Sequence, residues 1–181
     1  MPVETMMEID MKTLLATLLA LIAIAPLAVA DVRAGPLPEP TGKTLLVVRG
    51  NIERTNRGDA AHFDLAMLEA LPGRTARVET PWTNGTVAFE GPLLRAVLDH
   101  VGAQGEKLVI RALNDYSAEV PLSDARDFDT ILALKKDGKH MSVREKGPIF
   151  LIYPFDKNPE LYNEKYFVRS VWQIKEIEVM R

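Results

Sequence analysis

The absence of cysteine limits what this chain can fold into. None of its 181 residues is a cysteine, so disulfide bonds and thiolate metal sites are excluded. The fold must therefore be stabilised by a hydrophobic core alone. Hydrophobic residues make up 47% of the sequence, and a chain of this length holds one domain with a sizeable core.

Residues 1–30 have the pattern of a cleavable secretory signal peptide. An apolar run at residues 13–26 follows a lysine and leads to Ala28-Val29-Ala30, a small-x-small cleavage signal. The run is shorter than the roughly 20 apolar residues that a membrane span needs, and an uncleaved anchor helix is the alternative. Because residues 1–10 are acidic where a signal peptide is basic, translation from Met11 is a second possibility. We expect export to the periplasm.

Residues 31–43 are predicted to form an extended linker. They contain three prolines and two glycines, a composition that favours an extended spacer. The domain itself is expected at residues 44–181. The net charge is −3, and no run of Arg or Lys supplies the basic patch that nucleic-acid binding requires. Nucleic-acid partners are therefore not expected.

Hydrophobic periodicity predicts more strands than helices. Alternating or short apolar runs predict strands at residues 44–49, 75–80, 107–112, 118–121, 130–135 and 149–153 and within 166–179. Helical spacing predicts short helices at residues 63–71, 93–101 and 122–127. Pro92 is expected at the first helical position of the second helix, Ser123 as the cap of the third, and residues 136–139 as a hairpin turn. The predicted fold class is α+β, with a mixed β-sheet and short helices.

A series of short motifs runs in a fixed order through the predicted domain. They are Phe89-Glu90-Gly91-Pro92-Leu93-Leu94, Asn114-Asp115-Tyr116-Ser117, Pro121 before Asp124, Leu132-Ala133 with Asp137-Gly138, Gly147-Pro148-Ile149 with Pro154, and Val171-Trp172. In this order the motifs resemble the sulfite-oxidase-type molybdopterin-binding domain family. The resemblance covers nearly the whole chain after the linker, and it implies the sulfite-oxidase-like molybdopterin-binding fold.

The resemblance also implies what this chain has lost. In the enzymes of that family a cysteine thiolate ligates molybdenum, and it would fall between about Val78 and Trp82, where this chain has no cysteine. A small, exported, cysteine-free chain is similar to a subgroup that binds free pterins in the periplasm. In that subgroup the loaded protein signals to the periplasmic part of a membrane GGDEF or EAL enzyme, which makes or degrades cyclic diguanylate. The resemblance thus implies a non-catalytic pterin receptor.

Two aromatic residues are candidates for stacking on a pterin, which is a flat polar heteroaromatic ring. Trp82 lies on a Pro/Asn/Gly loop at the end of a predicted strand, and Tyr116 lies in a second turn from which it would stack on the other face. The alternative for Trp82 is a lid that packs on the core. The alternative for Tyr116 is a cap at the sheet edge.

Four polar residues are candidates for holding the edge of the ring. Asn114 and Asp115 offer an amide and a carboxylate for the amino and ring N–H groups, although plain turn chemistry also explains them. Thr83 offers a hydroxyl. Arg169 lies near where the related enzymes place basic residues that face the cofactor, and a surface ion pair is its alternative.

Two further functions stay open from the sequence. One is a molybdopterin-dependent oxidoreductase, or a subunit of one, whose metal is held by the pterin dithiolene without a protein thiolate. The other is a structural or partner-binding domain without a ligand, in which Trp82 and Tyr116 would be buried and no pocket would lie between them. His62, His100 and His140 are far apart in the sequence and lack metal-ligand spacing, so no metal site is expected from protein side chains.

Overall fold

The structure is a computed structural model that describes residues 36–181. The predicted signal peptide lies outside these residues. Their largest sheet has five strands in the order β2-β1-β11-β5-β6. The strands are β2 (Ala61–Phe63), β1 (Leu46–Gly50), β11 (Ile174–Met180), β5 (Lys107–Ala112) and β6 (Ser117–Pro121). β1 and β11 run parallel, whereas the other neighbours are antiparallel, so the sheet is mixed, as predicted.

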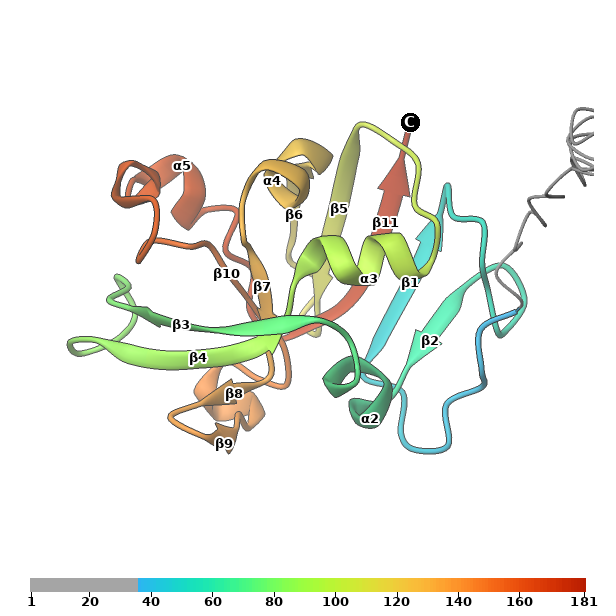
Figure 1. Cartoon of the computed structure of the whole chain (residues 1–181), viewed down its shortest axis with the longest axis horizontal. Coiled ribbons are helices and arrows are strands. Elements are labelled where there is room, and N and C mark those ends of the chain that lie inside the picture. Colours follow the sequence, from blue (N-terminus) through green and yellow to red (C-terminus); the bar gives the residue numbers. More distant parts are fainter. Residues whose placement is uncertain (1–35) are drawn as a thin grey trace, which may run out of the picture. The chain divides into compact units, whose positions relative to one another are not determined.

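A second sheet of four strands projects beside the first (Figure 1). Its order is β3 (Gly73–Val78), β4 (Val87–Pro92), β8 (Lys135–Lys136) and β9 (Lys139–His140). A pair of strands, β7 (Ile131–Ala133) and β10 (Phe150–Ile152), lies between the sheets and is wholly buried. The N–H of Leu134 donates to the carbonyl of Glu90 at 2.8 Å, which ties the end of β7 to β4.

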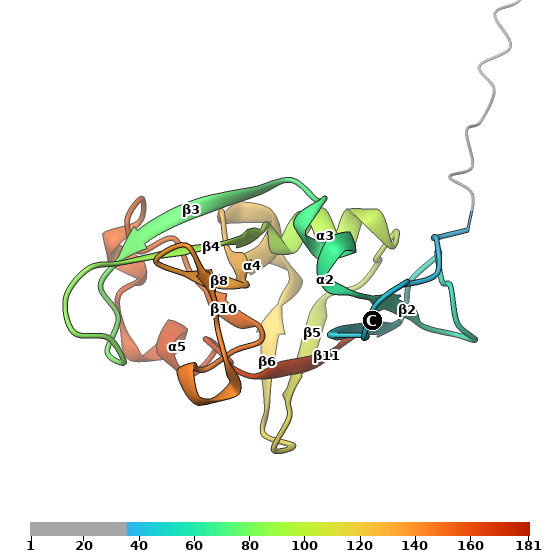
Figure 2. The same cartoon turned by 90° about the horizontal axis from the view of Figure 1, so that it is seen from below.

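Short helices complete the fold. They are α2 (Leu65–Glu69), α3 (Leu94–His100), α4 (Leu122–Asp127) and α5 (Glu164–Phe167), with 3-10 turns η1 (Val143–Glu145) and η2 (Pro159–Leu161). α3 and α4 lie over one face of the five-stranded sheet (Figures 1 and 2), and α3 buries Leu94, Val97 and Leu98 there. No helix within residues 36–181 has the length and apolarity to cross a membrane. The predicted α+β class is confirmed.

Steric crowding explains why one residue of the quoted motifs, Gly91, is a glycine. A Cβ on Gly91 would come within 2.0 Å of the carbonyl oxygen of Leu132, well inside contact distance. Any larger residue would therefore push β4 away from β7.

Several predicted boundaries are wrong. The helix predicted from residue 63 begins at Leu65, because Phe63 ends β2 and Asp64 caps α2 by accepting a bond from the N–H of Met67 at 2.9 Å. Pro92 does not open α3: it ends β4 and pairs with Gly73.

Two other local predictions are also corrected. Ser123 lies inside α4, whose N-cap position is Pro121, and no side chain caps the helix. The extended run predicted within residues 166–179 starts too early, because Tyr166 and Phe167 belong to α5 and the strand begins at Ile174.

Part of the predicted linker is fixed to the domain. The backbone N–H groups of Thr41 and Gly42 donate to the Asp64 carboxylate at 2.9 and 2.8 Å. Leu37 is buried against the core. Residues 36–43 therefore extend across the domain surface and are held to it at both ends.

Candidate functional site

An aromatic cavity of about 710 Å³ opens where four segments meet. Its walls come from the loop after β3, the β5–β6 turn, α5 and the segment that precedes β11. The chain has two tryptophans, Trp82 and Trp172, and both line this cavity together with Tyr116 and Phe167. Aromatic walls of this kind suit a flat heteroaromatic ligand.

The tryptophans belong to a cluster of tilted rings. The ring centroid of Trp82 lies 5.6 Å from those of Trp172 and Phe150 and 5.9 Å from that of Phe167. These separations are typical of edge-to-face aromatic pairs. Trp82 is half-buried, so it both packs on the core and presents part of its ring to the cavity. Tyr116 is 50% exposed at the rim, and its hydroxyl donates to the carbonyl of Val168 at 3.3 Å.

The loop that carries Trp82 is held by two threonines. The N–H of Thr80 donates to the Thr83 hydroxyl at 3.1 Å, and the two hydroxyl oxygens also lie 3.1 Å apart. The N–H of Trp82 donates to the Thr80 hydroxyl at 3.3 Å. Thr83 was predicted to bind ligand, but it does not line the aromatic cavity, and its hydroxyl is engaged within the loop. It therefore orients Trp82.

Asn114 and Asp115 lie in the same turn and point to different partners. Asn114 lines the aromatic cavity, and its Oδ1 accepts a bond from the N–H of Tyr116 at 3.2 Å. Asp115 does not line it; its carboxylate pairs with Lys175 at 2.6 Å, and this bond lowers the Asp115 pKa. Of the predicted site residues, Trp82, Asn114 and Tyr116 are thus brought together.

Arg169 turns away from the cavity that its neighbours line. Its guanidinium donates to the Asp124 carboxylate at 2.8 Å, and the same oxygen accepts a bond from the Tyr153 hydroxyl at 2.7 Å. Burial and the Asp124 bond raise the pKa of Tyr153, so this hydroxyl stays a donor. Because Val168 and Ser170 line the cavity, the Arg169–Asp124 pair fastens the cavity wall to α4.

A smaller cavity of about 260 Å³ has Trp82 and Thr83 in its wall. Lys136, Arg144 and Lys146 also line it. Lys146 holds its ammonium group 4.2 Å from the centre of the Trp172 ring, a cation–π contact that braces the aromatic cluster from outside.

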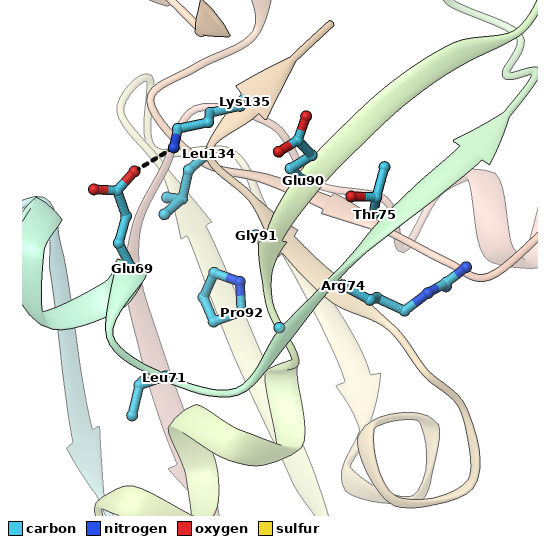
Figure 3. Close-up of a pocket in the computed structure, with 10 residues that line it drawn as sticks. Glu69, Leu71, Arg74, Thr75, Glu90, Gly91, Pro92, Leu134 and Lys135 are labelled. Carbon is cyan, nitrogen blue, oxygen red and sulfur yellow. Dashed lines mark ion pairs between the residues drawn. The ribbon is translucent and has the colours of Figure 1, made fainter. Parts of the chain in front are cut away.

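A third cavity, of about 480 Å³, lies at the opposite end of β3 and β4 (Figure 3). Figure 3 shows Glu69 and Lys135 joined across it by an ion pair of 2.7 Å. Glu90 and Arg74 add one charge of each sign to its walls. None of the predicted site residues lines it, and it has no aromatic wall for a pterin.

Eight residues that line the aromatic cavity were not predicted as site residues from the sequence: Pro81, Ala112, Glu164, Phe167, Val168, Ser170, Val171 and Trp172. Of these, Glu164 and Phe167 lie on α5. The sequence signal for α5 was Asn163, whose side chain caps this helix by accepting a bond from the N–H of Lys165 at 3.1 Å.

Within residues 36–181, no group of three or more His, Asp or Glu side chains is placed to hold a metal ion.

Comparison with known proteins gives one family. The model of the oxidoreductase molybdopterin binding domain matches residues 65–181, more than half of the chain. A search of curated proteins found no match. The matched segment includes every wall of the aromatic cavity. The chain therefore belongs to the oxidoreductase molybdopterin-binding domain family.

Proposed function

We propose that this protein is a periplasmic receptor for a reduced, metal-free pterin, and that it signals rather than catalyses. In this proposal the loaded protein reports pterin availability to the periplasmic domain of a membrane GGDEF or EAL enzyme of cyclic-di-GMP metabolism. The observation that carries the proposal is the convergence of Trp82, Trp172 and Tyr116 on one cavity. Its volume of about 710 Å³ lies within the range of small-molecule sites.

The chemistry of the chain does not fit the metal-bearing form of the family's cofactor. A soft thiolate is the protein ligand suited to molybdenum in this fold, and the chain has no cysteine. The aromatic walls that stack on a pterin are nevertheless present. A scaffold that keeps these walls and lacks the thiolate is suited to binding the pterin ring itself.

The cavity also argues against a purely structural domain. That alternative requires Trp82 and Tyr116 to be buried packing residues, yet both line an open cavity and Tyr116 is 50% exposed. Val168 at the same rim is 56% exposed, and Leu113 in the adjoining turn is 45% exposed. Exposed apolar side chains beside a ligand site support recognition by a protein partner. The signal-peptide pattern of residues 1–30 supports the periplasmic location.

Tryptophan fluorescence tests the binding. Because both tryptophans line the cavity, anaerobic titration with a tetrahydropterin should quench their emission, with calorimetry as an independent measure. Tyr116→Ala should weaken binding by about 10-fold, since one stacked aromatic face is worth about 1–3 kcal/mol. Val143→Ala is the matched control, because Val143 is also 50% exposed but does not line the cavity. Absence of binding at millimolar tetrahydropterin would refute the receptor.

Two further measurements separate the remaining functions. Elemental analysis of the purified protein should show no molybdenum or tungsten; a stoichiometric metal would instead favour the oxidoreductase. Pull-down with the periplasmic domain of a GGDEF or EAL protein encoded beside this one should depend on added pterin. Pterin binding without any pterin-dependent capture would retain the receptor and reject this partner.

A further inference from the structure

One wall of the aromatic cavity carries a carboxylate that the family assignment does not explain. Glu164 is the one charged side chain among the described residues that line this cavity. We infer that Glu164 and Asn114 together select a 2-amino-4-oxo pteridine by reading its hydrogen-bonding edge. This inference rests on the proposed pterin receptor and specifies which ring chemistry that receptor accepts.

The Glu164 carboxylate is available to bind a ligand, because the contacts of this residue within the protein involve its backbone. Its carbonyl accepts a bond from the N–H of Val168 at 3.1 Å, which fixes the residue in α5. Within residues 36–181, no hydrogen bond or ion pair engages its carboxylate. The side chains of Asp115 and Arg169 are already engaged, with Lys175 and Asp124.

Asn114 supplies a donor on another wall of the cavity. The N–H of Tyr116 can only donate, so the Asn114 atom that it contacts at 3.2 Å is the oxygen Oδ1. The amide nitrogen Nδ2 therefore keeps its two N–H groups, which have no partner in the part of the chain that the structure describes. The cavity thus combines an acceptor pair with a free donor between aromatic walls.

This set of groups complements the edge of a pterin. The 2-amino group and the ring N3–H are adjacent donors, which one carboxylate accepts side by side as it does a guanidinium. The 4-oxo group is an acceptor for the Asn114 amide. A lumazine carries an oxygen at position 2 in place of the amino group, and that oxygen would face the Glu164 carboxylate without a proton between them. The site should therefore reject lumazines.

The expected size of the preference for a pterin over a lumazine follows from the strength of hydrogen bonds to a charged group. Such bonds contribute about 1.5–3 kcal/mol, which corresponds to about 10- to 100-fold in affinity. The wild-type protein should bind a tetrahydropterin more tightly than the corresponding tetrahydrolumazine by about this factor. Glu164→Gln should lose most of the discrimination, because the amide offers one acceptor and one donor in place of two acceptors.

The test is a two-ligand titration of wild type, Glu164→Gln and the control Glu160→Gln. Glu160 is an exposed glutamate of η2 that does not line the cavity, and its substitution should leave both affinities unchanged. Selective loss of tetrahydropterin affinity in Glu164→Gln supports the inference. Equal affinity of wild type and Glu164→Gln for tetrahydropterin overturns it while leaving the receptor intact. Failure of the wild type to bind either ligand overturns the receptor itself.

Discussion

Replacing Asp124 by asparagine should show how firmly the cavity wall is fastened. Asp124 is buried, and one of its carboxylate oxygens accepts bonds from both Tyr153 and Arg169. Removing one partner of a buried pair costs about 3–5 kcal/mol, since the other charge is left uncompensated. The Arg169 side chain keeps 19% of its surface exposed, and asparagine retains an acceptor oxygen. We therefore expect a loss of about 2–3 kcal/mol in the free energy of unfolding.

Urea denaturation measures this loss of unfolding free energy directly. In thermal denaturation the same loss should lower the melting temperature by about 5–10 °C for a domain of this size. The double variant Asp124→Leu/Arg169→Met removes both charges and is the control for coupling. It should recover part of the stability that Asp124→Leu loses alone, because no unpaired charge is left. A loss below 1 kcal/mol for Asp124→Asn, or strictly additive effects in the double variant, would show that this pair does not fasten the wall.

Two other predictions concern the sheets and the acid stability. Gly91→Ala should yield little folded protein, or lose more than about 3 kcal/mol by denaturation, because the added methyl meets the Leu132 carbonyl at 2.0 Å; a variant with unchanged stability would contradict this geometry. Lys157 and Arg95 lower the Asp129 pKa to about 2 from an ordinary value of 3.8. This pairing stabilises the fold above about pH 4 and is lost as the pH falls toward 2. The Asp129→Asn variant should therefore be less stable than the wild type at pH 7, and it should lose less stability than the wild type between pH 4 and 2. Parallel acid-unfolding curves for the two proteins would refute the assignment.

Local sequence patterns predicted those elements whose limits are set by neighbouring residues. The strand at residues 107–112 alternates buried and half-buried side chains, and the structure has it with the predicted bounds. The hairpin at residues 136–139 is also present, because Asp137-Gly138 takes the left-handed backbone that such a turn requires. By contrast, Phe63 continues a helical spacing but lies in β2, where it pairs with Leu46 of β1. Its structure is therefore set by pairing with another strand and not by the local spacing.

The difference between local patterns and long-range contacts also explains which residues of the candidate site were predicted from the sequence. Trp82 and Tyr116 stood out in the sequence because loop aromatics at strand ends often bind ligands. Glu164 was not predicted, since its short helix reaches the cavity only through the packing of the whole segment between β10 and β11. Arg169 was predicted to face the ligand, but the structure pairs it with Asp124, which no local pattern indicates. Three-dimensional contacts between remote segments therefore supplied what periodicity did not.

The place of β11 in the large sheet has a consequence for biosynthesis. β11 lies between β1 and β5, and its Glu178 contacts Arg49, which is 129 residues earlier in the chain. A nascent chain that ends before Ile174 leaves β1 and β5 without the strand that joins them. Contacts of such long range form slowly, and incomplete sheets expose edges that aggregate. The five-stranded sheet should therefore be completed only after the last strand has emerged from the ribosome.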